Sequence, residues 1–513
     1  MKRIFLFSIT FLCLKLGAQV PEDAIRYSWL PHNGTARNMA TGGVMGSLGG
    51  DITATFTNPA GLGFFKTNEA VITPGIFMNR NKVTFRDSLS RSDKNTFNFG
   101  PSGVIIALTD KYNTRQSAAM SFAITQTANF NNRYSYGSLN NFSSFSEQFA
   151  EEFGNSNYSI SDISTSNSPL PYTVSPAFFS HLIDTVTVNG QTIIKAAPEY
   201  ILDQGQALRQ QLTRTTTGGM YELAGAYAHN FKDKWYFGAG LGVPFIYLNS
   251  KTTFTESDTS ATTNDFSSFT FQDNYTSMGV GFNAKLGVIY RPEEYFRIGF
   301  SFQTPTFMTL TDERETEVTT IFASPADTFN YQSAEFSADQ TGETMYQQFS
   351  PWKAMLSASY VFREVENVKR QRAFISADVE YVNHKGTKFK SNNEEPTVAE
   401  KRYYKALTGV VKDQYKGTFN FRVGGELKFN TVMGRLGFAY YGNPYKNAPE
   451  KANMIMLSGG LGYRHKGFFV DLTYVNNMRK DFEIPYRLED RANVYASNDL
   501  TRGQVVATVG VKF

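Results

Sequence analysis

The last nine residues of the chain alternate between apolar positions and polar or small ones. Thr508 and Lys512 fall on one face, and the other face carries Val505, Ala507, Val509, Val511 and Phe513. A period of two with one apolar face predicts a half-buried β-strand. A terminal strand that ends on an aromatic residue is typical of outer-membrane β-barrels. The sequence therefore predicts such a barrel, closed by its last strand, with Phe513 at the periplasmic rim.

Thirteen further segments show the same alternation. Their charged residues fall opposite the apolar face, which is typical of a barrel with a polar lumen. A soluble all-β protein with an apolar core is the competing interpretation. The predicted fold class is all-β transmembrane, a fourteen-stranded antiparallel outer-membrane β-barrel. The fourteen segments are residues 70–85, 96–108, 117–134, 221–227, 235–243, 280–288, 296–303, 356–360, 375–381, 419–429, 436–441, 455–464, 468–474 and 505–513.

The connections between these segments alternate in length. The short ones are residues 109–116, 231–234, 291–294, 363–370, 430–433 and 465–467. The long ones are residues 138–218, 251–274, 313–351, 389–417 and 481–502. Short periplasmic turns that alternate with long extracellular loops are the barrel pattern, and an even strand number places both termini in the periplasm. We therefore expect the barrel to span residues 67–513.

Two of the long connections carry helical patterns. Phe145, Phe149 and Phe153 are spaced four apart, which predicts an apolar stripe on a helix over residues 143–153. The run from Thr397 to Glu400 is a capping box, which predicts a helix that continues to about Lys412. Each helix is expected to pack as part of an extracellular lid.

Residues 1–18 predict a signal peptide. A positive start at Lys2 and Arg3 is followed by a short apolar run and by small residues before Gln19. The apolar run is shorter than the ~20 residues that a membrane span needs, and a buried N-terminal helix is the alternative. Cys13, the only cysteine, lies in this segment. The mature chain would then have none, which excludes disulfides, thiolate metal sites and a cysteine nucleophile.

Net charge gives no indication of a nucleic-acid partner. The precursor carries +4, and removal of Lys2, Arg3 and Lys15 with the signal peptide leaves the chain near neutral. Later residues contain no run of ~18 apolar residues, which excludes helical membrane spans. The 45 Phe, 28 Tyr and 41 Gly fit a barrel in which only alternate residues face lipid.

Residues 19–66 do not alternate, so we do not expect them in the barrel wall. They hold glycine-rich runs at 34–43 and 48–51, followed by Asn58-Pro59-Ala60-Gly61-Leu62-Gly63. Pro59 lacks a backbone N–H, glycine reaches conformations that other residues avoid, and asparagine can start a turn. Such turn chemistry suits a plug that satisfies its own backbone inside a barrel. An ordinary turn before the first strand is the alternative.

This layout resembles that of the FadL-type outer-membrane transporters of long-chain fatty acids and aromatic hydrocarbons. The Asn58-Pro59-Ala60-Gly61 run is similar to the motif of the family's hatch, and the strand number, long loops and closing strand agree with its architecture. The resemblance implies a hatch over residues 19–66. It also implies passive uptake of hydrophobic compounds, by capture at extracellular loops, lumenal binding beside the hatch and lateral release into the membrane.

The resemblance implies that the ligand leaves the barrel sideways at the third predicted strand. This strand alternates through Phe122 and Ile124 and then becomes polar. The alternative interpretation is that this stretch is the strand emerging above the lipid. The candidate residues for a lateral opening are Gln126, Asn129, Asn131 and Asn132.

A carboxylate ligand in a partly dry lumen needs a cation or several hydrogen-bond donors. Alternation points five cations inward, and Lys285 and Arg422, which lie in mid-strand, are the candidates for ligand binding. Five carboxylates are also expected to face inward, so salt bridges within the wall are the structural alternative for each cation. These inward groups are Lys285, Arg297, Arg422, Lys428 and Arg435, with Glu222, Asp378, Glu380, Glu426 and Asp471.

No pattern indicates an enzyme, a cofactor or a metal. The five histidines have no paired metal spacing, and Gly238-Ala-Gly-Leu-Gly242 lies in a predicted strand and not at the strand-to-helix turn of a phosphate site. We interpret these glycines as lumenal positions that leave room for the plug. The expected partners are hydrophobic small molecules, outer-membrane lipids and, through Phe513, the barrel assembly machinery.

We expect a monomer in the outer membrane of a Gram-negative bacterium. A FadL-like barrel that serves as a scaffold or shuttle in protein secretion is the alternative function, and a general pore is a third. The large loops with helices fit either of the first two functions.

Overall fold

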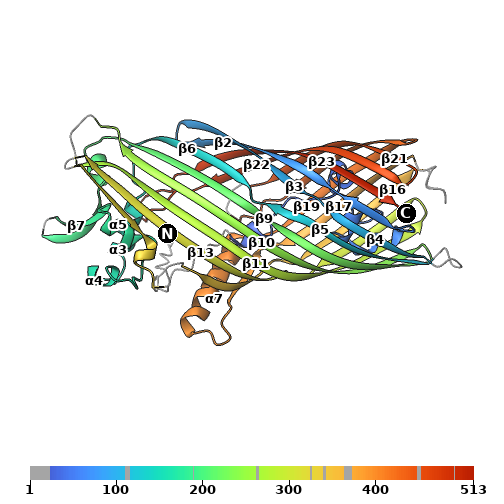
Figure 1. The fold of residues 1–513 in the computed structure, drawn as a ribbon, viewed down its shortest axis with the longest axis horizontal. Coiled ribbons are helices and arrows are strands. Elements are labelled where there is room, and N and C mark those ends of the chain that lie inside the picture. The colour runs from blue at the N-terminus through green and yellow to red at the C-terminus, as the bar shows by residue number, and fades with distance from the viewer. Residues whose placement is uncertain are drawn as a thin grey trace, which may run out of the picture.

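The computed structural model describes residues 23–109, 116–188, 190–260, 265–323, 326–338, 342–362, 372–446, 452–489 and 491–513. Their strands form one closed antiparallel β-barrel (Figure 1). β1 (Glu69–Ile72) pairs with β23 (Ala496–Lys512) and closes the wall, with Ile72 opposite Val509. The backbone of Phe513 also exchanges two hydrogen bonds with Asn68, each of 3.1 Å. The predicted pairing of the last strand with the first is confirmed.

Fourteen strands make up the wall, as predicted. Eight are continuous: β9 (Leu208–Phe231), β10 (Trp235–Asp258), β11 (Phe266–Glu293), β19 (Gly417–Phe429), β20 (Val432–Tyr441), β21 (Met454–His465), β22 (Phe468–Glu483) and β23. Six are each divided in two: β1 with β2 (Pro74–Phe85), β3 (Ser88–Phe99) with β4 (Ser102–Thr109), β5 (Ser117–Asn129) with β6 (Asn132–Asn140), β12 (Phe296–Gln303) with β13 (Phe307–Ala323), β15 (Thr344–Phe349) with β16 (Lys353–Phe362), and β17 (Ala373–Asn383) with β18 (Lys388–Ser391). We call the end of the barrel at Phe513 the turn end and the opposite end the loop end.

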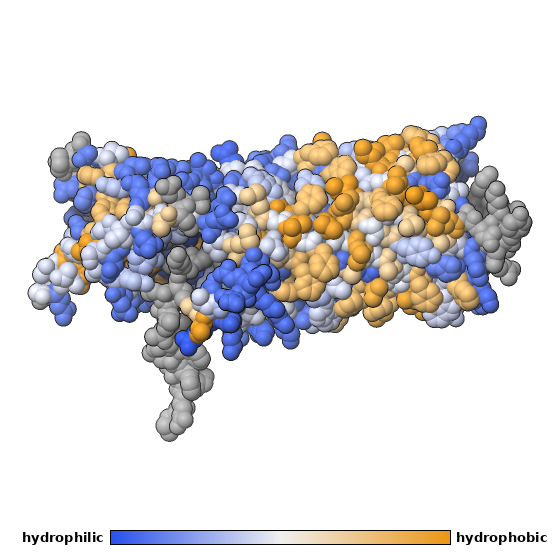
Figure 2. Space-filling model, turned by 60° about the horizontal axis from the view of Figure 1, so that its bottom comes forward, coloured by the Kyte–Doolittle hydropathy of each residue, from blue (hydrophilic) through white to orange (hydrophobic). Residues whose placement is uncertain are grey.

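Outward-facing apolar side chains form a belt over the turn-end part of the barrel (Figure 2). On β10, Phe237, Leu241 and Tyr247 are exposed, while the residues that alternate with them face inward. Beyond Tyr247 the outward residues of this strand are polar, beginning with Asn249 and Lys251. The predicted outer-membrane barrel fold, with an apolar outside and a polar lumen, is confirmed. In the described part of the chain, no helix is long and apolar enough to cross a membrane.

Several strands continue farther than alternation predicts. β10 and β11 occupy most of the predicted loop 251–274, and β13, β14 (Ala326–Gln332) and β15 occupy most of the predicted loop 313–351. β6 and β9 shorten the predicted loop 138–218 in the same way. The predicted loop boundaries are wrong here because, beyond the belt, the outward face of the wall is polar and the inward apolar residues do not recur at every second position. The backbone ladder continues there without a periodic apolar signal.

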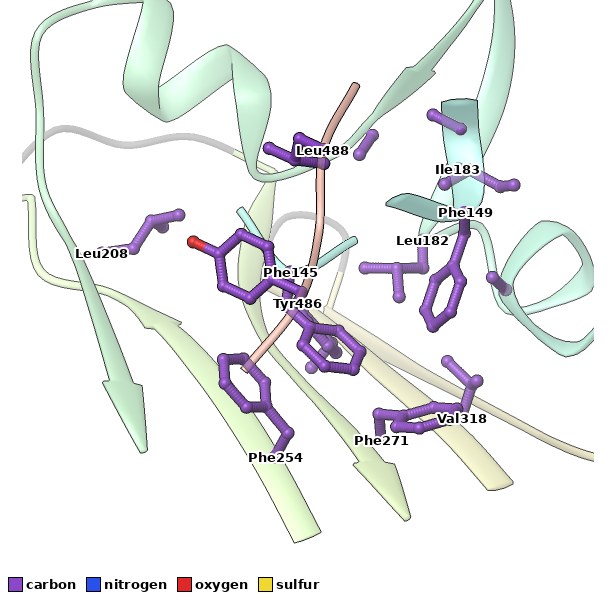
Figure 3. Packing of buried hydrophobic residues seen from close by; sticks show 14 of the residues in the cluster. Phe145, Phe149, Leu182, Ile183, Leu208, Phe254, Phe271, Val318, Tyr486 and Leu488 are labelled. Carbon is purple, nitrogen blue, oxygen red and sulfur yellow. The ribbon is translucent and has the colours of Figure 1, made fainter. Parts of the chain in front are cut away.

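A cap of residues 141–188, 190–207, 484–489 and 491–495 covers the loop end. An aromatic cluster joins the cap to the wall (Figure 3). The ring of Phe145 stacks on that of Phe254, with 4.2 Å between the ring centroids, and its centroid lies 5.8 Å from that of Tyr486. The predicted helix over 143–153 is present but begins later than expected. The cap contains α3 (Glu147–Gly154), α4 (Ile160–Ile163), α5 (Val174–Phe179), α6 (Glu199–Asp203) and a hairpin of β7 (Ile183–Val188) and β8 (Gln191–Ala196).

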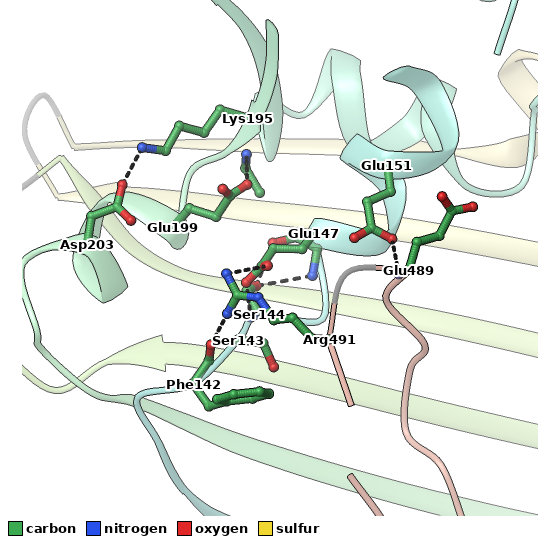
Figure 4. Close-up of polar contacts among 12 residues, drawn as sticks. Phe142, Ser143, Ser144, Glu147, Glu151, Lys195, Glu199, Asp203, Glu489 and Arg491 are labelled. Atoms are coloured by element: carbon green, nitrogen blue, oxygen red, sulfur yellow. Dashed lines mark hydrogen bonds and ion pairs between the residues drawn. The ribbon is translucent and has the colours of Figure 1, made fainter. Parts of the chain in front are cut away.

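Polar contacts fasten the two parts of the cap to each other and to the wall (Figure 4). Arg491 forms an ion pair of 3.2 Å with Glu147 at the start of α3. The Ser144 amide donates to Glu147 at 2.6 Å, and the Ser144 hydroxyl donates to Glu256 of β10 at 2.5 Å. The cap is therefore tied to the wall through buried carboxylates.

The second predicted helix is present as α7 (Val398–Gln414). Thr397 and Glu400 form the predicted capping box, with a side chain to backbone hydrogen bond in each direction. Tyr404, Leu407 and Val411 are buried on one side of the helix. Figure 1 shows that α7 projects sideways from the barrel wall.

Candidate functional site

Residues 23–66, which we call the N-terminal segment, lie inside the barrel and precede the first wall strand. They begin in the loop-end half of the lumen, where the Tyr27 hydroxyl donates to Ser277 at 3.2 Å, and they end beside Phe513. The segment contains α1 (Asp23–Arg26), α2 (Ala36–Ala40) and two 3-10 turns, η1 (Ile52–Thr55) and η2 (Pro59–Phe64).

Residues 1–22, with the predicted signal peptide 1–18, lie outside the described part of the chain. Strand parity, from which both termini were expected in the periplasm, locates only the entry into the first strand at Glu69. It does not specify the position of the residues before that strand. The first described residues, Asp23–Arg26, lie in the lumen toward the loop end.

Inward-facing polar side chains of the wall hold the backbone of this segment. The Asp378 carboxylate accepts hydrogen bonds from the amides of Met45 and Gly46, at 3.0 and 3.2 Å. The Thr508 hydroxyl of the last strand accepts one from the Ala36 amide at 2.7 Å. Buried backbone groups need hydrogen-bond partners. Some of the polar side chains that face the lumen are therefore there to bond to the backbone of the N-terminal segment.

The Asn58-Pro59-Ala60-Gly61 run opens η2 and is fully buried. The Asn58 side-chain oxygen accepts from the Ala60 amide at 3.2 Å, and its nitrogen donates to the Gly46 carbonyl at 2.5 Å. Pro59 takes the first position of the turn, where no amide donor is needed. Asn58 therefore joins two parts of the N-terminal segment.

Two wall glycines make room for this motif. A Cβ at Gly238 would overlap the backbone of Pro59 and Ala60, and one at Gly287 would overlap the Asn58 side chain. The expectation that glycines of β10 leave space inside the barrel is confirmed at Gly238. Gly242 instead borders Glu222 of the wall itself.

The lumenal charges are largely paired with one another. Lys285, a predicted ligand-binding residue, forms an ion pair with Glu222. Arg422, the second candidate, lies 2.8 Å from Glu380. A third buried group consists of Arg435 with Glu426 and Asp471, at 2.6 Å each. Within the described residues, no cluster of His, Cys, Asp or Glu is placed to hold a metal ion.

A cavity of about 390 Å³ lies between the N-terminal segment and the wall. One side is formed by the segment itself, and the other by wall strands that include the polar stretch of the third strand. Most of its surface is apolar, and three of the four candidate exit residues, Gln126, Asn129 and Asn132, border it. Its apolar lining includes Ile25, Trp29, Leu30, Phe77, Phe130 and Val475.

The wall is discontinuous beside this cavity. β4 pairs with β5, but among the described residues β3 forms no backbone ladder with β5 or β6, although it lies next to β6. Side chains bridge the strands instead, with Asn129 donating to the Phe97 carbonyl at 2.9 Å and Gln126 accepting from the Phe99 amide at 3.3 Å. A register shift against β9 falls between Gln126 and Ala128. This region therefore lacks the backbone hydrogen bonds that seal the other wall strands.

No protein-family model matches the chain, and no curated protein matches it. A solved FadL homologue of Pseudomonas aeruginosa is similar, with a TM-score of 0.53 and 13% sequence identity over 94% of this chain and 99% of that one. The P. putida toluene transporter TodX is similar, with a TM-score of 0.50 and 12% identity, over 94% and 99%. The chain has the FadL fold. The shared fold covers nearly the whole of each chain.

Within this FadL fold, Arg502 is a lumenal cation that was not among the predicted inward-facing residues. It borders the cavity, its Nε donates to Asn79 at 2.6 Å, and its guanidinium lies 5.0 Å from the centre of the Phe77 ring. In the described part of the chain, no carboxylate lies at ion-pair distance from it. Residues 481–502 were predicted to be a loop. Continuing the alternation back from Val505 places Arg502 on the inward face, so the signal was present.

Arg479, a second arginine of this FadL-fold cavity, lies across Trp29. Its guanidinium is 4.7 Å from the centre of that ring, and its charge is paired with Asp481. Because Arg502 has a neutral partner, these three charged groups together carry one positive charge in excess. Such a surface can bind an apolar chain and an anionic group together.

Proposed function

We propose that this protein is an outer-membrane transporter for the passive uptake of hydrophobic compounds. The loop end faces the outside, the cap is where compounds are captured, and the cavity beside the N-terminal segment is where they bind. The observation that carries this proposal is the position of a mostly apolar 390 Å³ cavity against the discontinuity in the wall. The FadL fold, which toluene transporters share, supports it.

The N-terminal segment is the hatch of this transporter. Its bonds to side chains of two separate strands of the wall, at Asp378 and Thr508, support a plug that stays in place while a small compound passes beside it. The Asn58-Pro59-Ala60-Gly61 motif is the part seated on wall glycines. Only a local shift of the segment is then needed to open a path.

The discontinuity between β3 and β6 is the lateral exit. The Gln126 and Asn129 side chains bond to the backbone of β3 there, the Asn132 side chain accepts from that of Asn81, and the Asn131 side chain donates to the Gly218 carbonyl of β9. A few side-chain bonds therefore replace a continuous ladder. Phe97, at this edge, is exposed at the outer limit of the apolar belt. A compound leaving here would enter the outer part of the bilayer.

Arg502 receives the head group of an anionic amphiphile, such as a long-chain fatty acid. Lys285 and Arg422 already meet wall carboxylates, whereas Arg502 has a neutral partner in Asn79. Hydrogen bonds to charged groups contribute about 1.5–3 kcal/mol, or roughly tenfold to a hundredfold in affinity. The apolar lining would hold the chain of the same molecule.

Binding of a fatty acid and of its methyl ester to the purified barrel tests this assignment. Arg502→Gln should weaken fatty-acid binding by roughly tenfold to a hundredfold and leave the ester within about twofold. Arg209→Gln, at an exposed position on β9, is the matched control. Equal losses for acid and ester would refute the head-group role. Failure of the wild type to bind either compound would overturn the transport proposal.

Cysteine staples test the lateral exit, because the chain has only Cys13 in the predicted signal peptide. A disulfide between Ser88→Cys of β3 and Ser138→Cys of β6, whose hydroxyls lie 3.4 Å apart, should abolish uptake in cells while leaving ligand binding intact, and reduction should restore uptake. A staple between Ala107→Cys and Ala119→Cys, which are register partners in the intact ladder, should have no effect. Full uptake through the oxidised Ser88–Ser138 staple would exclude this exit.

A further inference from the structure

Basic side chains gather on the outside of the barrel around α7. Between residues 388 and 416 the chain has seven basic and four acidic residues. One of the acidic residues, Glu400, is held in the capping box. We use the name basic patch for six exposed residues on β18, on α7 and just after it: Lys388, Lys390, Lys401, Arg402, Lys405 and Lys416. The patch is separate from the lumenal cavity.

An aromatic row marks the outer limit of the apolar belt below this patch. The rings of Phe302, Trp352, Tyr381 and Phe419 follow one another across neighbouring strands, with centroid distances of 6.1, 5.4 and 5.1 Å. Such aromatic girdles lie at the level of lipid head groups in membrane barrels. Lys416 precedes Phe419 by three residues, which places its backbone close to that level.

Lys390 contacts a separate pair of aromatic residues in the wall. Its ammonium lies 4.8 Å from the centre of the Phe349 ring, and Phe349 packs against Phe307 at 5.1 Å. Phe307 is itself exposed on the outside of the barrel. Lys388 stands opposite Phe349 in the β15–β18 ladder. Both lysines are therefore at the height where the belt gives way to polar surface.

The direction of α7 determines what these cations face. The helix projects sideways from the wall (Figure 1), so its exposed residues extend over the membrane surface and not over the lumen. A basic helix beside an apolar belt can bind the negatively charged head groups of membrane lipids. Lysine side chains also reach from an apolar border to such groups through their flexible stems.

We propose that the basic patch binds the phosphate groups of lipid A, the phosphorylated glycolipid of the outer leaflet. The proposal rests on the orientation given above, with the loop end outside, but not on the identity of the transported compound. Near an anionic membrane surface each Lys or Arg contributes about 1 kcal/mol. Several cations within reach of a phosphorylated head group would hold one lipid beside α7.

Native mass spectrometry of the full barrel with diphosphorylated lipid A tests this. The variant Lys388→Gln/Lys390→Gln/Lys416→Gln should bind the lipid at least tenfold more weakly than the wild type. The control Lys232→Gln/Lys234→Gln/Lys466→Gln removes the same charge from the turn end and should bind like the wild type. Heat-modified gel mobility verifies that each variant is folded.

Two further lipids separate the possible results. Dephosphorylated lipid A should bind the wild type as weakly as it binds the patch variant. Equal binding of the two lipid A forms, or of diphosphorylated lipid A to wild type and patch variant, would overturn the proposal. Equal competition by phosphatidylglycerol would overturn the assignment to lipid A. Fatty-acid binding by the patch variant should be unchanged, so a failure here is distinct from a failure of transport.

Discussion

Glu256 should make the docking of the cap depend on pH. It lies on β10 beyond the apolar belt, is fully buried, and accepts hydrogen bonds from the Phe145 amide at 2.8 Å, from Gln210 at 2.6 Å and from the Ser144 hydroxyl. All three donors are neutral. Burial raises the pKa of Glu256 to about 7, although these hydrogen bonds oppose the rise. Burial likewise raises the pKa of Glu147 to about 7, opposed by its bond to Ser144 and by Arg491.

The sign and size of the effect follow from these pKa values. An undocked, hydrated glutamate has a pKa near 4.5, so the docked cap binds the proton more tightly. Docking is therefore most favourable below about pH 4.5, and that advantage is lost as the pH rises to about 7. A shift from 4.5 to about 7 corresponds to roughly 3 kcal/mol for each carboxyl, or on the order of 100-fold in the docking equilibrium.

Hydrogen exchange of the amides in α3 measures this equilibrium. After correction for intrinsic exchange rates, protection in the wild type should fall as the pH rises from 5 to 8. Glu256→Gln keeps the shape of the side chain but cannot be ionised. Protection of α3 should therefore fall less between pH 5 and 8 in this variant than in the wild type. Asp184→Asn, at an exposed carboxylate of β7, should leave the decrease unchanged. An unaltered pH dependence in Glu256→Gln would refute the role of this carboxyl.

Four further tests address the plug, the fit of its motif against the wall, the assembly and the alternative function. Deletion of residues 23–66 should produce a steady conductance in planar bilayers that the full chain lacks, and a silent deletion barrel would argue against a plug. Gly238→Val should destabilise the barrel by about 1–3 kcal/mol because it crowds Ala60, measured by thermal unfolding, whereas Gly434→Val meets open space and should be near neutral. Removal of Phe513 should lower the yield of assembled barrel, and a normal yield would contradict its role at the rim. The purified protein should carry no stoichiometric secreted protein, and a stable complex would favour the secretion role.

The membrane-facing wall could be predicted from the sequence because lipid imposes a strict rule on it. Leu241 and Leu436, exposed by 65% and 75%, are tolerated only where the surroundings are apolar, so their spacing reports the strand directly. The helix at Val398 was equally accessible, because its capping box is a local signal. The alternation depends only on the lipid that the strand faces, and the capping box depends only on residues close together in the sequence.

The site depended on partners that alternation does not specify. Alternation pointed Lys285 and Arg422 inward, but their ion pairs with Glu222 and Glu380 depend on side-chain directions between strands. Arg502 was not predicted to face the lumen, because the alternation of apolar and polar residues in the last strand stops at Val505. The missing ladder between β3 and β6 is likewise a relation between backbones, which the polar stretch from Gln126 to Asn132 only suggested.

The path of the N-terminal segment constrains the order in which the molecule is built. Its Ala36 is among the first residues to leave the ribosome, yet it bonds to Thr473 at 2.6 Å and to Thr508 at 2.7 Å, on the last two strands to be made. Contacts so distant in sequence form late in folding. The segment therefore stays without these partners until the last two strands are made, and we expect the wall to close around it. The machinery that inserts this protein would then hold an open sheet with the N-terminal segment already inside it.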